Sequence, residues 1–389
     1  MSSSPKTMKA IVISAFGPVE NLVIRDVPIP TATPGTALIK IKGFGINHAE
    51  MRMPDPLPLL APPRTSPSLT DNPDMRRGEW AESVPISGIE CVGTIVACPG
   101  GEFPPGTPVA ALMGGLGRTI PGSYAQYTVA RMGNIVALSP SPPLTTTTTT
   151  TTTITPRKSN NSEPTPKEAP AAPETPPLPW PALAALPETY ATAWTTLFRN
   201  LDLQPSDRLL IRGATSALGR AAANLAVAAG AVVTGTTRSA SHFDELRALG
   251  VAEAVLEGEI GSRKGGQFDK VLELVGNSTV VESLGLVRRG GRVCLAGWLG
   301  GLQPIREFDP LAQMASGVQL SFFGSFVFGT PEFPLSDVPF GEIVRAVAEG
   351  RFDAAPWRVF RFGEIREAHR CMEEGRARGK MVVVVDEEA

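Results

Sequence analysis

From residue 209 onward the chain alternates between short apolar runs and stretches with helical spacing, and this alternation constrains the fold more than any other feature. Apolar runs at 209–214, 231–239 and 269–276 predict strands, and the segments between them predict helices. Strands that are apolar throughout and joined by helices are typical of a parallel sheet covered on both faces. We therefore predict a doubly wound α/β domain in this part of the chain.

The first of these strands runs into a glycine-bounded turn, G-A-T-S-A-L-G, at residues 213–219. Glycine lets backbone N–H groups approach a pyrophosphate, and the N-terminus of the following helix favours an anion. Thr215 and Ser216 add hydroxyl donors. The motif predicts a dinucleotide site, and the alternative is a turn that needs glycine for packing alone.

The second strand ends about 20 residues after the glycines, where a carboxylate would hold the 2′-hydroxyl of NAD. This sequence reads Thr236-Thr237-Arg238-Ser239 at that place. A guanidinium and hydroxyls without a carboxylate favour a 2′-phosphate, so we predict NADPH as the cofactor. The alternative is that Arg238 is only a solvated side chain at a strand end.

Residues 8–138 predict an all-β barrel or sandwich, because short apolar segments alternate with glycine and proline. Two proline-rich insertions stand out: residues 54–76 hold seven of the 38 prolines, and residues 139–179 hold eleven. The second insertion has too few bulky aliphatic side chains to offset the entropy of ordering it, so we expect it to be disordered. The apolar run 380–386 needs a sheet to join, and the first domain is the expected host.

Charge and composition exclude several classes of protein. The formal net charge is −2, which argues against binding nucleic acid by phosphate neutralisation. The chain has no apolar run of membrane-spanning length, and its first residues lack a signal-peptide pattern, so we expect a soluble, cytoplasmic protein. The four cysteines are scattered without a C-x-x-C pair, so neither a disulfide framework nor a zinc knuckle is indicated.

Taken in order, the motifs resemble the medium-chain dehydrogenase/reductase superfamily, in its zinc-independent quinone-oxidoreductase (zeta-crystallin-like) branch. The matching segments are 8–22, 43–51, 85–115, 122–129, 186–194, 212–219, 268–276, 288–297 and 379–385. The resemblance implies a GroES-like β-barrel catalytic domain at 1–184, which contains both insertions, and a Rossmann domain at 185–325. Residues 326–389 would return to the catalytic domain. It also implies a homodimer formed through Rossmann edge strands, for which 318–326 is a plausible edge.

The resemblance also implies the residues of the site. Asn47 and Thr192 would face the nicotinamide and the substrate, and they are the candidate catalytic residues. Together with the glycine motif, it assigns the cofactor to Gly213, Thr215, Ser216, Ala217, Leu218, Gly219, Arg238, Ser239, Asn277, Gly297, Trp298, Gly324 and Ser325.

Zinc-dependent relatives carry a cysteine ligand near the position of Asn47 and a His-Glu pair downstream. Here Gly88-Ile89-Glu90 has no histidine before the glutamate, so we predict no metal site. A tyrosine often present in quinone reductases is replaced by Arg52, so no tyrosine donor is expected from that position. His48 is interpreted as structural, and Tyr124 and Tyr127 as packing residues.

Without a metal, hydride transfer requires an acceptor that is already electron-poor. We therefore predict an NADPH-dependent oxidoreductase that reduces a quinone or another activated carbonyl compound, a small-molecule substrate. An enoyl or alkenal double-bond reductase of a biosynthetic pathway is the first alternative. A non-catalytic NADPH-binding structural or regulatory protein is the second.

Overall fold

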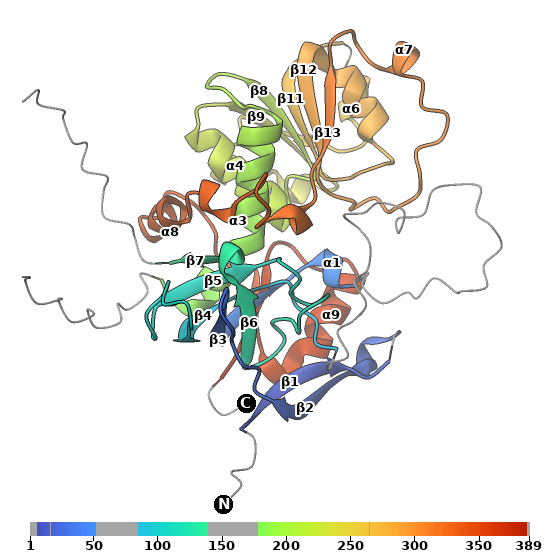
Figure 1. Ribbon diagram of the computed structural model, residues 1–389. Helices are drawn as coiled ribbons and strands as arrows, with labels where there is room; N and C mark the ends of the chain where they lie inside the picture. The colour runs from blue at the N-terminus through green and yellow to red at the C-terminus, as the bar shows by residue number, and fades with distance from the viewer. Residues whose placement is uncertain (1–5, 16, 52–84, 139–177, 264, 387–389) are drawn as a thin grey trace, which may run out of the picture.

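The computed structural model describes residues 6–15, 17–51, 85–138, 178–263 and 265–386. The insertion at 54–76 lies outside the described residues, as does the one at 139–179 except for its last two positions. The described chain forms two lobes, a β-rich lobe that contains the first and last described residues and an α/β lobe above it (Figure 1). None of the helices within these ranges is both long enough and apolar enough to cross a bilayer.

The β-rich lobe contains one seven-stranded sheet and a separate antiparallel pair, β1 (Thr7–Ile13) and β2 (Leu22–Pro28). The large sheet has the order β14-β15-β3-β4-β5-β7, and β6 pairs with β3. Its strands are β3 (Thr36–Ile46), β4 (Glu90–Ala97), β5 (Pro108–Leu112), β6 (Tyr127–Arg131), β7 (Ile135–Ala137), β14 (Arg358–Arg361) and β15 (Met381–Val384). The helices of this lobe are α1 (His48–Met51), α2 (Trp180–Ala184) and α9 (Ile365–Glu373).

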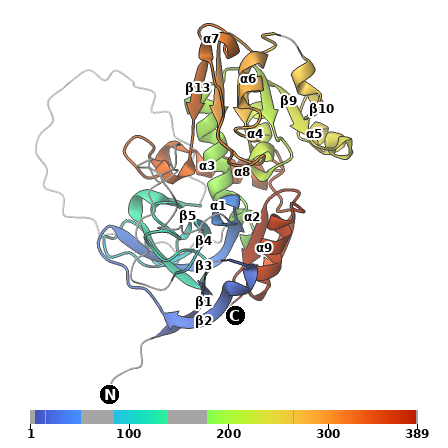
Figure 2. The ribbon, with the colours of Figure 1, turned by 90° about the vertical axis from the view of Figure 1, so that its right-hand side faces the viewer.

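The end of the chain returns to this lobe. Strand β15 lies between β14 and β3, and Met381 is paired with Ile46 in antiparallel register. Met381, Val382 and Val383 are fully buried. A strand with apolar side chains on both faces needs cover on both faces, and here Met381 and Val383 pack into one hydrophobic cluster while Val382 packs into another. Figure 2 shows α9, which precedes β15, along the outside of the same lobe.

The α/β lobe contains a six-stranded parallel sheet with the order β10-β9-β8-β11-β12-β13. This arrangement confirms the predicted doubly wound domain. The strands are β8 (Arg208–Arg212), β9 (Val232–Thr237), β10 (Glu253–Leu256), β11 (Phe268–Glu273), β12 (Val287–Leu295) and β13 (Gln319–Phe322). The helices are α4 (Ala217–Ala228), α5 (Phe243–Ala248), α6 (Val280–Leu286) and α7 (Pro310–Gln313).

Two elements differ from the sequence-based expectation. The pattern of residues 278–291 predicts one helix, but α6 ends at Leu286 and the chain is extended from Val287. A right-handed helix cannot continue through Gly290, because its φ is +73°. Val287 is buried in a strand that pairs with β11. Strand β14 was not predicted, because three of its four residues are exposed and it has no apolar periodicity.

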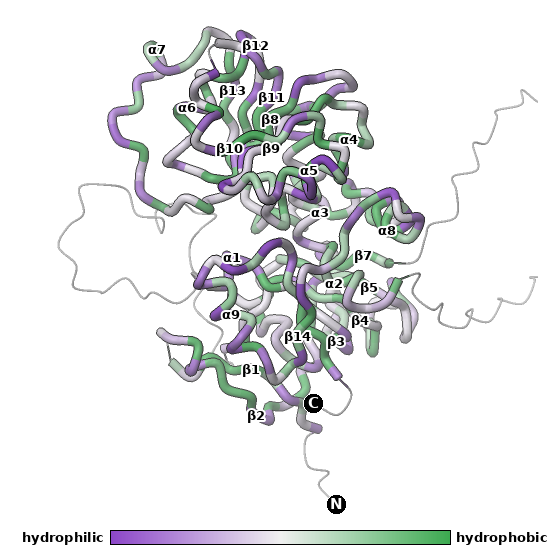
Figure 3. Tube along the Cα trace, turned by 180° about the vertical axis from the view of Figure 1, so that it is seen from behind, coloured by the Kyte–Doolittle hydropathy of each residue, from purple (hydrophilic) through white to green (hydrophobic). Residues whose placement is uncertain are grey.

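One hydrophobic cluster runs through both lobes. It contains Ile89 and Leu112 of the β-rich lobe together with Leu209 and Ala222 of the α/β lobe. Helix α3 (Pro187–Trp194) connects them, because it contacts α4 on one side and β4 and β5 on the other. Helix α8 (Phe340–Ala348) adds its apolar face to the same cluster. Figure 3 shows the hydrophobic segments concentrated along the strands and in the middle of the molecule.

Candidate active site

The turn between β8 and α4 combines a left-handed glycine with the capped N-terminus of a helix. Gly213 has a φ of +76°, a left-handed conformation that glycine adopts without strain. The Oγ of Ser216 accepts the Gly219 N–H at 3.0 Å and so caps α4. A Cβ on Gly219 would come within 2.5 Å of the Gly213 carbonyl oxygen. Glycine at 219 therefore lets α4 pack against the turn, with its positive end at the loop.

This turn lies where the order of the strands reverses, since β8 has β9 on one side and β11 on the other. Open α/β sheets bind their ligands in the crevice beyond the carboxyl ends of the strands at such a point. Thr215, Ser216, Ala217 and Leu218 are all partly exposed there. The fold thus brings the predicted phosphate-binding residues to the place where sheets of this type bind dinucleotides.

A buried arginine fixes the turn between β8 and α4 through ion pairs and hydrogen bonds. Arg212, at the end of β8, is only 1% exposed. Its guanidinium pairs with Glu257 and, at 2.8 Å, with Glu282, and it lies 3.8 Å from Glu273. Glu257 also accepts a hydrogen bond from the Thr236 hydroxyl, which in turn accepts the Gly213 N–H at 3.0 Å. The ion cluster therefore fixes the backbone of the first glycine.

The end of β9 differs in one respect from what the sequence indicates. No carboxylate stands at the end of this strand or in the six residues after it, but Glu257, which follows the neighbouring β10, reaches Thr236. Its charge is balanced by Arg212. Arg238 and Ser239 are exposed, and the Ser239 Oγ accepts the Ser241 N–H at 3.3 Å. Among the described residues, Glu257 is the only carboxylate that contacts the Thr236 hydroxyl, and it is already paired with Arg212.

The predicted residues after β11 and β12 lie together. Trp298 Nε1 donates to Asn277 Oδ1 at 3.3 Å, and Asn277 Nδ2 donates to the Gln303 carbonyl at 2.9 Å. A Cβ on Gly297 would come within 2.6 Å of the Leu274 carbonyl oxygen, so the two loops approach closely. A cavity of about 380 Å³ opens beside Asn277. It is lined by Ser278, Val281, Gly300, Gly301, Gln303, Pro304, Ile305, Arg306 and Gln313.

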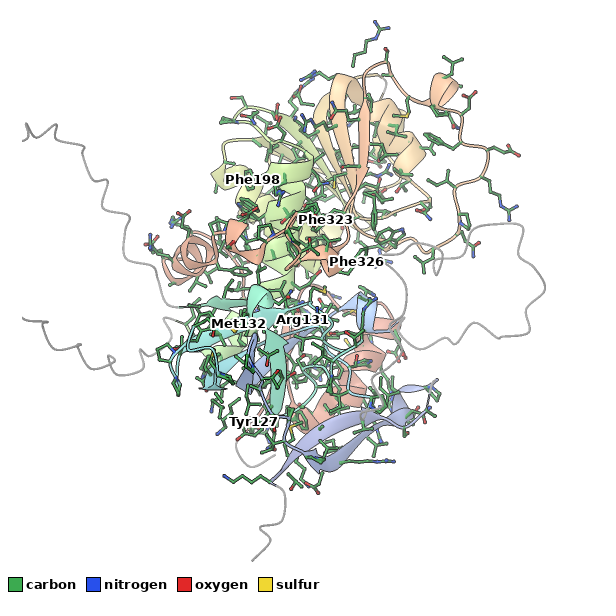
Figure 4. All side chains as sticks on the ribbon, viewed as in Figure 1. Tyr127, Arg131, Met132, Phe198, Phe323 and Phe326 are labelled. Atoms are coloured by element: carbon green, nitrogen blue, oxygen red, sulfur yellow. The ribbon has the colours of Figure 1, made fainter. Side chains whose placement is uncertain are left out.

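The segment after β13 brings two further predicted residues to the junction of the lobes. Gly324 and Ser325 are partly exposed and follow Phe323, which is buried and packs against Phe328. Figure 4 shows Phe323 and Phe326 at the base of the α/β lobe, above Arg131 and Met132 of the β-rich lobe.

Asn47 belongs to a buried network of charges at the same junction. Lys380 Nζ donates to Glu90 Oε1 at 2.6 Å and to Asn47 Oδ1 at 2.7 Å, and Asn47 Nδ2 donates to Glu90 Oε1 at 2.8 Å. Glu90 is fully buried and Lys380 is 7% exposed. A Cβ on Gly45 would lie 2.8 Å from Lys380 Nζ and closer still to Glu90, so only glycine leaves room for the pair. The network holds the Asn47 amide in one orientation.

Thr192 joins this network through Glu188, at the start of α3. The Glu188 N–H donates to Glu90 Oε2 at 2.7 Å, and the Thr192 hydroxyl donates to Glu188 Oε1 at 3.1 Å. Ser325 also hydrogen-bonds to the Glu188 carboxyl. Burial raises the pKa of Glu188, while nearby Lys380 opposes that change. The structure therefore connects Thr192 and Ser325 through the Glu188 carboxyl, and connects these to Asn47 through the Glu90 carboxyl.

A second buried group lies behind Asn47. Glu50 accepts the N–H groups of Asn47 and Ile89 and, at 2.7 Å, the hydroxyl of Tyr124, whose oxygen is 3.0 Å from His369 Nε2. Burial raises the pKa of Glu50 to about 7 and lowers that of His369 to about 4. Tyr124, predicted to pack in the core, is fully buried but also orders the loop that carries Asn47.

The sequence analysis missed Glu90, Glu188 and Lys380. A signal was present for two of them, since Glu90 precedes the apolar run of β4 and Lys380 precedes that of β15. Charged residues are almost never buried without a partner, so opposite charges beside two buried strands indicate a pair.

Comparison with known proteins agrees with this architecture. The family model described as zinc-binding dehydrogenase matches residues 238–383. The quinone oxidoreductase from Coxiella burnetii superposes with a TM-score of 0.69 at 19% identity, over 98% of this chain and 100% of that one. Residues 238–383 therefore resemble a dehydrogenase family, and the described chain has the fold of the medium-chain dehydrogenase/reductase structures. The predicted GroES-like plus Rossmann fold is thereby confirmed, and the dehydrogenase match agrees with the predicted family.

Other relatives are similar over different lengths. The CurK enoyl reductase has a TM-score of 0.66 at 21% identity, over 98% of this chain and 100% of its own. A mycobacterial protein complexed with NADPH has a TM-score of 0.70 at 18% identity, with coverage of 97% and 99%. Polyketide synthase GfsB of Streptomyces halstedii is 30% identical over 209 residues, which is 53% of this chain and 4% of GfsB. The chain thus spans only a small part of the curated relatives that it matches.

The name of the matching family implies zinc, but the residues at the junction do not fit it. Asn47, Glu90 and Glu188 include neither cysteine nor histidine, and a Lys380 ammonium is already bound to two of them. A fixed positive charge among the would-be ligands repels a divalent cation. The described residues also contain no cluster of three histidine, cysteine or acidic side chains arranged to hold a metal.

Proposed function

We propose that the chain is a zinc-independent, NADPH-dependent oxidoreductase that transfers hydride to a quinone or another activated carbonyl acceptor. The observation that carries the proposal is the position of the glycine-bounded turn at the strand-order reversal, with the Asn47 network at the junction of the same lobes. An acceptor that needs no metal is proposed because an ammonium, and not a metal-ligand set, lies beside Asn47.

The residues fit a dinucleotide at the turn. The partly exposed backbone of Thr215 to Leu218 and the N-terminus of α4 would hold the diphosphate, and Arg238 and Ser239 would hold a 2′-phosphate. Asn277 would lie near the cofactor ribose, and Gly297, Trp298, Gly324 and Ser325 would line the nicotinamide end. When bound, NADPH supplies a hydride from its nicotinamide ring.

The chain's own residues would stabilise the acceptor. Negative charge develops on the acceptor oxygen during reduction, and fixed donors in a dry site stabilise that charge. Asn47 is held by Lys380 and Glu90, so its second Nδ2 hydrogen has a defined direction. The Lys380 ammonium adds a positive charge directly behind the amide.

A reductase of enoyl or alkenal double bonds is the second candidate, and the comparisons favour it. The similarity to polyketide synthase GfsB and the fold shared with an enoyl reductase both point to acyl substrates with a conjugated double bond. Such a reduction needs a proton donor near the acceptor as well as a hydride.

The first experiment measures NADPH oxidation side by side with a quinone and with an α,β-unsaturated thioester or aldehyde. Faster turnover of the quinone supports the first candidate, and faster turnover of the enone supports the second. Tight NADPH binding without turnover of either would instead favour a non-catalytic, structural or regulatory protein. Alcohol oxidation that follows added zinc and disappears with chelator would contradict both reductase proposals.

The cofactor assignment has its own test in Arg238→Asp. We expect the affinity for NADPH to fall far more than that for NADH, because the substitution replaces a 2′-phosphate partner with a repelling charge. Arg289→Asp is the matched control, since Arg289 is exposed at the amino end of β12, away from the carboxyl ends that bind ligands. Equal loss of both cofactors in Arg238→Asp would refute the 2′-phosphate assignment.

A further inference from the structure

Glu188 lies at the centre of the groups that surround the proposed reaction. Its carboxyl is hydrogen-bonded by Thr192 and Ser325, two residues predicted to face the nicotinamide. Its backbone N–H binds Glu90, which also holds Asn47. Helix α3 is itself fixed between α4 and the strands β4 and β5, so the position of the carboxyl is set by both lobes.

The surroundings of Glu188 raise its pKa above the ordinary value. Burial is the main cause, and the neighbouring Glu90 carboxylate adds to it. Lys380 and the hydrogen bonds from Ser325 and Thr192 act in the opposite direction, and the Lys380 ammonium is also engaged by Glu90 at 2.6 Å. Glu188 nevertheless remains partly exposed. A carboxyl that has a raised pKa and can still be reached has two properties of a general acid.

Other groups nearby are less suited to give up a proton. Tyr124 is fully buried and donates its hydrogen to Glu50, and burial raises its pKa well above the ordinary value. Lys380 is 7% exposed, and loss of its proton would leave the Glu90 carboxylate unpaired. His48 is exposed on α1 next to Asn47, and it is therefore the competing donor that an experiment must address.

We propose that Glu188 is the general acid that completes the reduction of a conjugated carbon–carbon double bond. This rests on the proposed function in its enoyl or alkenal form. Addition of hydride to the β-carbon shifts the double-bond electrons to form an enolate. The O–H bond of Glu188 then breaks, its proton bonds to the α-carbon, and the electron pair stays on the carboxylate, which regains a proton from water. The two electrons come from the nicotinamide cofactor, which is oxidised.

The decisive variant is Glu188→Gln, because the amide keeps an oxygen to accept the Thr192 hydroxyl and leaves the N–H bond to Glu90 intact. We expect kcat with an enone to fall ~10²-fold or more, the size typical of a lost general acid, while NADPH affinity stays the same. The wild-type kcat should decline as rising pH deprotonates the carboxyl, and the variant should lose that decline. Glu188→Asp, which retains a carboxyl, should recover part of the rate and guards against misfolding of the amide variant.

Two matched substitutions serve as controls. Glu342→Gln makes the same change at an exposed position in the first turn of α8, and His48→Gln removes the competing donor. Neither should change kcat. In heavy water the wild type should place deuterium on the α-carbon in one configuration, whereas Glu188→Gln should give a mixture because solvent supplies the proton. A large loss in His48→Gln with normal Glu188→Gln would overturn the assignment.

A measurement without cofactor or substrate separates the two proposals. Infrared difference spectra of the apoprotein at neutral pH should show a protonated carboxyl that is absent from Glu188→Gln. If that band is missing, or if Glu188→Gln turns over normally while the wild type reduces enones, the general acid is refuted and the proposed function stands. If the wild type reduces no enone, the enoyl function fails, and the general-acid role fails with it.

Discussion

The buried pair of Lys380 and Glu90 makes a quantitative prediction about stability. In Lys380→Met the ammonium is lost, and the fully buried Glu90 carboxylate keeps only the neutral N–H groups of Asn47 and Glu188. Breaking a buried pair on one side costs ~3–5 kcal/mol, because an unpaired charge stays inside the protein. The exposed pair of Lys9 with Asp26, whose side chains are 40% and 59% exposed, is the comparison, and Lys9→Met should cost at most ~1 kcal/mol.

Equilibrium unfolding in denaturant at neutral pH measures the free energy of unfolding of each variant, with fluorescence and circular dichroism as independent probes. The double variant Lys380→Met with Glu90→Gln should recover most of the loss, since no charge is then left unpaired. The reasoning is wrong if Lys380→Met costs no more than Lys9→Met, or if the double variant is as unstable as the sum of the two single ones.

Two further predictions concern pH and assembly. The pKa of Glu50 is raised from its ordinary 4.5 to about 7, and that of His369 is lowered from 6.5 to about 4. Each shift changes the free energy of unfolding by ~3 kcal/mol between the pH values at which the group is fully protonated and fully deprotonated. Because the pKa of Glu50 is raised, Glu50 stabilises the fold below pH 4.5 and loses this effect by pH 7. Because the pKa of His369 is lowered, His369 stabilises the fold above pH 6.5 and loses this effect towards pH 4. In Glu50→Gln only the His369 effect remains, so thermal melts should show stability rising with pH. In His369→Gln only the Glu50 effect remains, so stability should fall with pH. Equal slopes in both variants would contradict the assignment. We also propose a homodimer through β13, whose Leu320 and Phe322 are 40% and 46% exposed at the edge of the sheet. Light scattering should show a dimer for the wild type and a monomer for Leu320→Lys, and a wild-type monomer would rule this interface out.

Much of the fold could be predicted from local pattern, because the doubly wound domain repeats one signal. Strands β8, β9, β11 and β12 are each followed by an α-helix, and Gly213 and Gly219 mark the turn that opens the domain. The end of α6 could not be predicted in this way. Val287 is apolar enough for a buried helix or a buried strand, and only its pairing with β11 places it in a strand.

The candidate site was less predictable because its members are far apart in the sequence. Asn47 lies next to Lys380 only after β15 has paired with β3, across a separation of 333 residues. Nothing near Glu188 indicates that Glu90 and Ser325 will surround it. The family resemblance supplied Asn47 and Thr192 but not Glu90 and Glu188, the two carboxyl groups that join them.

The hydrophobic cluster that continues through α3 has a consequence for how a substrate enters. A hinge motion that parted the lobes would expose Leu186, Ala191 and Leu197 to water, each of which is now fully buried. At ~25 cal/mol for each Å² of apolar surface, that exposure would oppose wide opening. Entry and release should instead depend on local movement of surface loops, and the rate of product release should respond to loop substitutions more than to changes within α3.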